Sequence, residues 1–133
     1  MTSQHATLLG RAGEFYCAYI LEKRGIRTTH VDIPHDDLWC TRPDGQMVRV
    51  QVKTSSKPTF QAKGHKLPRY NFRFHQTKHG SPSRVVLLFA DDRSLVLAMN
   101  RDDITGGTLK LKPDRFTKAA QEESLKRVFK LNA

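Results

Sequence analysis

The stretch from Asp37 to Lys53 (DLWCTRPDGQMVRVQVK) constrains the fold more than any other part of the chain. Pro43-Asp44-Gly45 predicts a tight turn, because proline presets φ, aspartate hydrogen-bonds its own backbone and glycine accepts a positive φ. Every second residue of 48–52 is a valine, and the alternate positions on the other face of this strand are Met47, Arg49, Gln51 and Lys53. Burial of the valine face leaves Gln51 and Lys53 side by side on the opposite face, so the stretch predicts a β-hairpin with a polar pair near its end.

Three polar side chains of this hairpin could form a catalytic site around a metal ion, two as ligands and one beside the metal. Asp37 offers a carboxylate and Gln51 an amide oxygen, and Mg²⁺ takes oxygen ligands at about 2.0–2.1 Å while it keeps several waters. Lys53 cannot bind the metal, but its amine can orient or deprotonate a water and offset charge that develops on a phosphate. Asp36 is the alternative acid. Asp37 is preferred because it directly precedes the apolar run 38–40, whereas Asp36 can cap the turn before it.

An acidic residue, a short hairpin and then (Glu/Asp/Gln)-x-Lys resembles the signature of the PD-(D/E)xK nuclease superfamily. In this chain the pattern is Asp37, thirteen intervening residues, and Gln51-Val52-Lys53. The glutamine, within the string 49–54 (RVQVKT), looks most like the small branch that includes bacterial intron-encoded homing endonucleases. The N-terminal string 10–14 (GRAGE) precedes a helical pattern and resembles the first helix of the family, whose glutamate contributes to the metal site; here that residue is Glu14.

The resemblance implies an α/β, restriction-endonuclease-like core: a central mixed β-sheet of about five strands flanked by an N-terminal and a C-terminal helix. It implies a DNA endonuclease that depends on Mg²⁺, with Mn²⁺ as a substitute. Asp37, Gln51 and Glu14 would then hold the metal, Glu14 directly or through water, and Lys53 would position the attacking water. Gln51 replaces the commoner acid, and a neutral ligand lowers the negative charge of the site and with it the metal affinity.

Apolar periodicity predicts the remaining elements. A helix is expected from Thr2 or Ser3 to about Arg24, with Gly25 just past its end. Its apolar face is expected to centre on Leu8, Ala12, Phe15 and Tyr19, with Leu9, Tyr16 and Ile20 beside them. Strands are expected at 26–33, 37–40, 69–74, 85–90 and 95–99, in addition to the strand after the turn, and 85–90 is expected to be the most buried. A C-terminal helix is expected to open at Pro113 and to pack Phe116, Ala120, Leu125, Val128 and Phe129 on the sheet.

The charge of the chain points to a polyanionic partner. The formal net charge is +10, and no acidic residue occurs between Gly45 and Ala90. Basic residues in this span alternate with aromatic ones, which is typical of a surface that follows phosphates. Residues 55–68 are expected to form a basic loop that could close over nucleic acid. The residues expected to contact nucleic acid are Arg49, Lys57, Lys63, Lys66, Arg69, Tyr70, Arg73 and Lys78.

The length of 133 residues predicts one nuclease-like domain over residues 1–133. Cys17 and Cys40 form no CxxC pair, which argues for reduced, packed thiols rather than a disulfide framework or a zinc site. With the positive charge, this predicts a cytoplasmic, nucleoid-associated protein. No stretch approaches the ~18 consecutive apolar residues of a membrane span, so no membrane partner is expected.

One catalytic centre cuts one strand, so cleavage of both DNA strands predicts a homodimer or a higher even oligomer. The candidate contact surfaces are the 95–99 strand and the C-terminal helix around Val128, Phe129 and Leu131, unless both simply close the core of the monomer. Two other functions fit the same residues. One is a nucleic-acid-binding module without cleavage, and the other is a Holliday-junction-resolvase-like nuclease or a mobile-element protein that acts on RNA.

Overall fold

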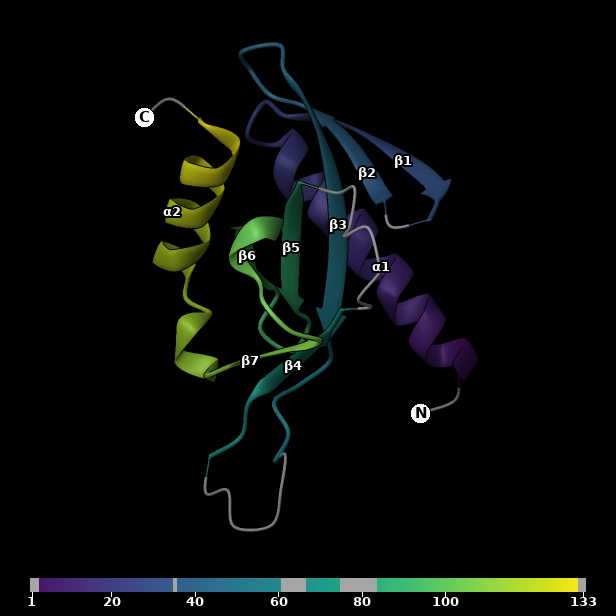
Figure 1. Ribbon diagram of the computed structural model, residues 1–133, viewed down its shortest axis with the longest axis vertical. Coiled ribbons are helices and arrows are strands. Elements are labelled where there is room, and N and C mark those ends of the chain that lie inside the picture. The colour runs from purple at the N-terminus through teal and green to yellow at the C-terminus, as the bar shows by residue number, and fades with distance from the viewer. Residues whose placement is uncertain (1–2, 35, 61–66, 75–83, 132–133) are drawn as a thin grey trace.

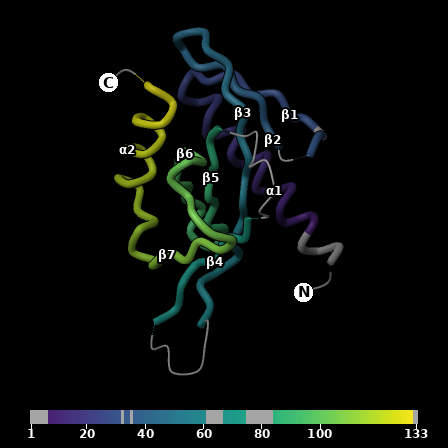
Figure 2. The backbone as a smooth tube through the Cα atoms, in the orientation of Figure 1, coloured from purple at the N-terminus to yellow at the C-terminus, as the bar shows by residue number. Residues whose placement is uncertain are grey.

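The computed structural model describes residues 3–34, 36–60, 67–74 and 84–131, with side chains except at 3–6 and 32 (Figure 2). A five-stranded mixed sheet forms its centre, in the order β1-β2-β3-β5-β6. Its strands are β1 (Arg27–Ile33), β2 (Asp36–Thr41), β3 (Met47–Ser55), β5 (Val85–Ala90) and β6 (Leu95–Asn100). Neighbouring strands are antiparallel except β3 and β5, which are parallel. With the helices α1 (Ser3–Glu22) and α2 (Lys118–Phe129), this confirms the expected fold class (Figure 1).

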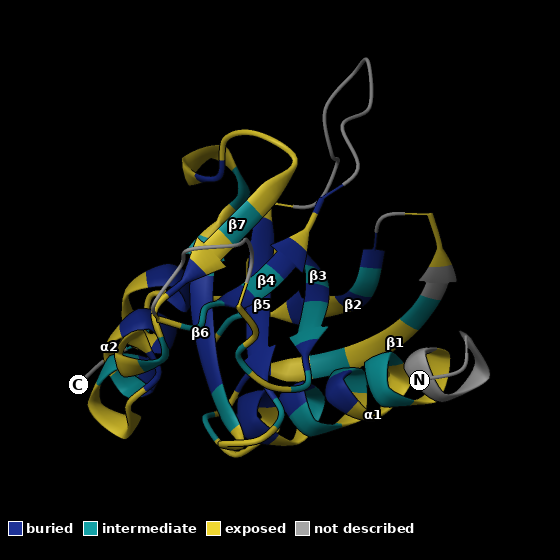
Figure 3. Ribbon diagram, turned by 90° about the horizontal axis from the view of Figure 1, so that it is seen from below, coloured by how far each residue is buried: buried dark blue, intermediate teal, exposed yellow. Residues whose placement is uncertain are grey.

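Two apolar clusters lie on opposite faces of the sheet. The helices α1 and α2 share one cluster, which also contains the three valines of β3. The other face is covered by a two-stranded antiparallel ribbon, β4 (Tyr70–Arg73) paired with β7 (Thr108–Leu111). Figure 3 shows the helices and the ribbon on opposite sides of the sheet. All six residues of β5 are buried, because successive side chains enter the two clusters alternately, and the strand expected to be the most buried is confirmed.

Helix α1 buries a different stripe from the one predicted. Its core face carries Gly13, Cys17 and Leu21 with Ile20, which was expected beside the stripe, whereas the centre of the predicted stripe is exposed. The exposed fractions are 59% for Leu8, 52% for Phe15 and 56% for Tyr19. The helix is apolar on more than one side, and the small residues allow the closer approach to the sheet. Its C-terminal end is as expected: Gly25 has φ +82°, and Ile26 N–H donates to the Leu21 carbonyl at 3.1 Å.

The C-terminal segment differs from expectation at its start. Residues Pro113–Arg115 form a 3₁₀ turn, and α2 begins only at Lys118, where the Thr117 hydroxyl accepts a hydrogen bond from the Ala120 N–H at 3.0 Å. Phe116 therefore precedes the helix and packs in the ribbon-side cluster. Among the described residues, neither helix is long and apolar enough to cross a membrane.

The two surfaces proposed for dimer contact belong to the core. Val128 is 6% exposed and Phe129 is fully buried between α2 and the sheet, with Leu131 packed beside them. Strand β6 is an edge strand of the sheet, as expected, but α2 lies on one of its faces and the ribbon-side cluster takes its other face. Both segments thus pack in the core of the monomer. The sequence analysis gave this as the alternative to dimer contact.

Candidate active site

The pairing of β2 with β3 ends where the predicted motif begins. The last pair is Leu38 with Val50, so Asp37 and Gln51 stand at a fork between the strands. One carboxylate oxygen of Asp37, Oδ2, accepts a hydrogen bond of 2.7 Å from the Val52 backbone N–H. Because Gln51 and Lys53 flank Val52 on the same strand, this bond holds the acid beside the polar pair. We call Asp37, Gln51 and Lys53 the fork residues.

Asp36, the other candidate acid, is engaged inside the hairpin. It is 2% exposed, and its Oδ2 accepts hydrogen bonds from Arg49 Nε at 2.5 Å and Trp39 Nε1 at 2.8 Å. These bonds satisfy a buried charge and tie β2 to β3. Asp36 is therefore a structural residue of the hairpin, and Asp37 is the acid that faces the fork.

The fork residues are partly desolvated. Burial raises the pKa of the Asp37 carboxyl above its ordinary value, and the charge of Asp36 adds to this rise, against the opposing effects of the Val52 N–H, Lys53 and His30. Burial also lowers the pKa of Lys53, against the attraction of Asp37, and Arg101 lowers it further. Both shifts indicate that the protein by itself stabilises the ionised forms of Asp37 and Lys53 less well than water does. An added cation near Asp37, or an added anion near Lys53, would stabilise the ionised forms.

Helix α1 approaches β3 most closely beside the motif. A Cβ atom on Gly13 would lie only 2.2 Å from the Oγ1 atom of Thr54, so this position accepts glycine and little else. Thr54 directly follows Lys53, and Glu14 directly follows Gly13. Glu14 thus lies in α1 one residue beyond the contact with the strand that carries Gln51 and Lys53.

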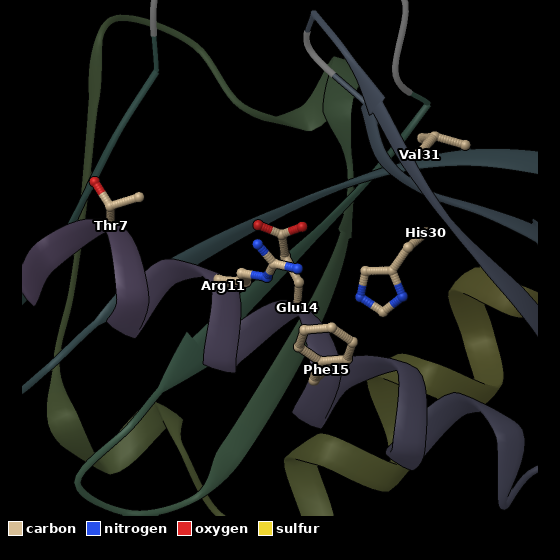
Figure 4. A pocket seen from close by; sticks show the side chains of 6 residues that line it. All are labelled: Thr7, Arg11, Glu14, Phe15, His30 and Val31. Atoms are coloured by element: carbon tan, nitrogen blue, oxygen red, sulfur yellow. The ribbon is translucent and has the colours of Figure 1, made fainter. Parts of the chain in front are cut away.

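Glu14 lines a cavity of about 400 Å³ between α1 and β1. Figure 4 shows the Arg11 guanidinium near the Glu14 carboxylate, with the rings of Phe15 and His30 beside them; the two ring centroids are 4.3 Å apart. His30 pairs with Leu38, which directly follows Asp37 in β2, so the cavity lies on the Asp37 side of the fork. The pKa of the Cys17 thiol is raised first by burial and then by the charges of Cys40, Glu14 and Asp37.

The oxygen donors expected at this site are of the chemical type that a hard divalent cation prefers. Within residues 7–31, 33–34, 36–60, 67–74 and 84–131, no three His, Cys, Asp or Glu side chains are arranged to hold a metal ion. The expected donor set is of another kind, because it combines the carboxylates of Asp37 and Glu14 with the amide oxygen of Gln51. Oxygen donors of mixed charge, with waters completing the shell, are typical of Mg²⁺ sites. The half-buried carboxylate with a raised pKa would be stabilised by such an ion.

Two residues beside Lys53 were not predicted from the sequence. The ring of Phe74, just after β4, lies under the Lys53 amine, with Nζ 5.4 Å from the ring centroid. The Arg101 guanidinium, just after β6, lies 5.2 Å from the same centroid. The sequence shows that Arg101 is basic, but it does not show that Arg101 shares a ring contact with Lys53. The two residues lie far apart in the chain, and no local pattern connects them.

The predicted nucleic-acid contacts have different environments. Lys57 and Arg73 are exposed, Arg69 is half-buried, and Arg49 is bound to Asp36. The expectation that Tyr70 contacts nucleic acid is wrong. Tyr70 is fully buried in the ribbon-side cluster, and its hydroxyl donates to Asp92 at 2.6 Å. The basic and aromatic alternation of β4 separates an outer from an inner face, and Tyr70 lies on the inner one. The other expected contacts, Lys63, Lys66 and Lys78, lie outside the described residues.

Sequence comparison finds no family model and no curated protein that matches the chain. Structure comparison finds a match: a bacterial homing endonuclease, I-Ssp6803I, with a TM-score of 0.68. The match covers 93% of this chain and 91% of that chain, with 18% sequence identity. The likeness therefore lies in the path of the backbone and the order of its elements. Over nearly its whole length, this chain has a fold similar to that of a bacterial homing endonuclease.

Proposed function

We propose that this protein is a metal-dependent DNA endonuclease of the homing or mobile-element type, which hydrolyses phosphodiester bonds. The observation that carries the proposal is the fork, where the Val52 amide holds the Asp37 carboxylate between Gln51 and Lys53. The fold similarity to a homing endonuclease and the formal charge of +10 support DNA as the substrate.

Three side chains would hold the metal. Asp37 and Gln51 would offer oxygen ligands, and Glu14 would complete the shell directly or through water. When bound there, Mg²⁺ or Mn²⁺ would supply positive charge for the phosphate and lower the pKa of a bound water. Asp36 has no place in this set, because Arg49 and Trp39 bind its carboxylate within the hairpin.

Lys53 would act on the water and the phosphate. Its amine lies over the Phe74 ring and within the field of Asp37, which limits the directions in which it can point. In hydrolysis the water oxygen forms a bond to phosphorus, one backbone P–O bond breaks, and the leaving oxygen gains a proton. The Lys53 ammonium would position that water by a hydrogen bond and offset the negative charge that builds on the phosphate.

The outer face of the β4–β7 ribbon is a suitable DNA-contacting surface. Asn71 pairs across the ribbon with Lys110, and Arg73 pairs with Thr108. With Thr59, these side chains line a polar hollow of about 390 Å³. A two-stranded ribbon fits the major groove of B-DNA, and Arg, Asn and Thr are side chains that contact base edges there. We propose that this face contacts DNA together with Lys57, Arg69 and the basic residues at 63, 66 and 78.

The experiment that tests this function is cleavage of supercoiled plasmids that carry a pool of random inserts. Wild-type protein should produce nicked or linear DNA in Mg²⁺ or Mn²⁺ and none in EDTA. Binding of the same plasmids should persist in EDTA, because the basic surface does not need the metal. Binding without any metal-dependent scission would favour the non-catalytic nucleic-acid-binding module instead.

A further inference from the structure

The ring of Phe74 contacts two cations, Lys53 of β3 and Arg101 just after β6. Its centroid lies 5.4 Å from Lys53 Nζ and 5.2 Å from Arg101 Cζ. The ring is 5% exposed, and the Phe74 N–H donates to the Gly107 carbonyl at 2.8 Å, so its position is fixed by β7 as well as by the core. Phe74 is therefore a fixed contact that Lys53 and Arg101 share.

The hydrogen bonding of Arg101 is incomplete. One of its terminal nitrogens donates to the Ile104 carbonyl at 3.0 Å, which orients the guanidinium. Its Nε is buried and has no hydrogen-bond partner among the described residues. No ion pair within that part of the chain involves Arg101 either. A buried donor normally has an acceptor, so this nitrogen is open to a partner other than the described residues.

The charges around the ring identify that partner as an anion. Lys53 and Arg101 are both partly removed from water, and like charges repel more strongly there than in bulk solvent. Asp37 acts on Lys53, and no ion pair among the described residues involves Lys53 or Arg101. A guanidinium presents donors in a planar fork that matches phosphate oxygens, and an ammonium supplies a compact charge.

We propose that Lys53 and Arg101 form a clamp for one DNA phosphodiester across the Phe74 ring, with Arg101 as a phosphate-binding residue of the active site. The identity of the anion as a DNA phosphate rests on the proposed function. The clamp itself rests on the two ring contacts and the unpaired nitrogen. Arg101 would thus bind the backbone at the point where Lys53 meets the reacting water.

The first test observes Arg101 directly and requires no cleavage. In wild-type protein labelled with ¹⁵N, the Nε–Hε resonance of Arg101 is identified by its absence from the Arg101→Lys spectrum. Addition of a mixed-sequence duplex in EDTA should shift this resonance and slow its exchange with water. The Nε–Hε signal of Arg127, which pairs with Glu123 on the far helix, should stay unchanged. An Arg101 resonance that does not respond to DNA would overturn the clamp.

The second test compares Arg101→Met with Arg127→Met as a matched control. Arg101→Met should lower single-turnover cleavage in Mg²⁺ by about tenfold to a hundredfold, and Arg101→Lys should fall between it and wild type. Arg101→Met should also reduce the salt slope of DNA binding in EDTA by about 1, whereas Arg127→Met should match wild type in both measurements. Equal cleavage and equal slope in Arg101→Met would contradict the clamp while the nuclease proposal stands. A shifted Arg101 resonance in a protein that never cuts DNA would refute the nuclease proposal and leave the clamp.

Discussion

Replacement of Gly13 by alanine should separate α1 from the motif strand. The new methyl group would lie 2.2 Å from Thr54 Oγ1 and 3.2 Å from a ring carbon of Phe89. Thr54 pairs with Phe89 in the middle of the five-stranded sheet, so β3 cannot yield without loss of its pairing with β5. The helix must therefore move, and Glu14 moves with it.

Two opposing effects set the change in the free energy of unfolding of Gly13→Ala. Alanine is favoured over glycine in a helix by about 1 kcal/mol, and overpacking of a well-packed contact costs about 1–3 kcal/mol. Gly13→Ala should thus lower the free energy of unfolding by about 0–2 kcal/mol. Gly10→Ala is the matched control, because no atom of the described residues lies within 4 Å of a Cβ at that position. It should raise the free energy of unfolding by about 1 kcal/mol.

Urea unfolding followed by circular dichroism measures the difference between the two variants. In a Thr54→Ala background the clash with Oγ1 is gone and the milder contact with the Phe89 ring remains. Gly13→Ala should then come close to Gly10→Ala, with a coupling energy of about 1–3 kcal/mol in the double-mutant cycle. Cleavage should fall in Gly13→Ala and recover with Thr54→Ala. If Gly13→Ala were as stable as Gly10→Ala in the wild-type background, the close contact of α1 with β3 would be wrong.

Three further outcomes follow from the site and its charge. Burial raises the pKa of Asp37 and lowers the pKa of Lys53. The proposed reaction uses the carboxylate and the ammonium, so the cleavage rate should rise with pH through the Asp37 pKa and fall through the Lys53 pKa. The alkaline fall should be missing from the residual activity of Lys53→Arg, and its persistence there would assign it to another group. If about six phosphates are neutralised, log K for duplex DNA should fall with log[salt] at a slope of roughly −5. Removal of the charges of Lys63, Lys66 and Arg69 together should flatten this slope, and a slope near zero in wild type would count against a phosphate-tracking surface. Sedimentation equilibrium at micromolar concentration should show a homodimer or a higher even oligomer on DNA, whereas a strict monomer with and without DNA would leave single-strand nicking or DNA binding without cleavage.

The hairpin could be predicted because its information is local. Alternation with a period of two fixes which face of β3 is buried, and the valines at 48, 50 and 52 do lie in the helix-side core. The turn residues 43–45 contain their own hydrogen bonds, including the Gln46 N–H to Asp44 at 3.0 Å. These constraints act within a few residues, so sequence pattern and structure agree there.

Features that depend on packing between distant segments could not be predicted in the same way. Helix α1 has apolar residues around much of its circumference, and only its fit against Thr54 decides that the Gly13 side is buried. The strand β7 was not expected, because its pairing with β4 needs a partner far away in the chain. The contact of Arg101 with Phe74 could not be predicted for the same reason, because the two residues lie far apart in the chain. The choice between Asp36 and Asp37 also needed structure, since neighbouring acids differ only in which partners bind them.

The central claim is that Asp37 is the acid of a metal-dependent catalytic site. It is tested most directly by single-turnover cleavage of the random-insert plasmids in Mg²⁺ with Asp37→Asn, beside Asp44→Asn as a control in the exposed turn, with DNA binding measured in EDTA. Loss of a metal ligand removes several kcal/mol of transition-state stabilisation, so Asp37→Asn should cleave about a hundredfold or more slowly and bind DNA as wild type does. Asp44→Asn should cleave at the wild-type rate. Full cleavage by Asp37→Asn would contradict the account.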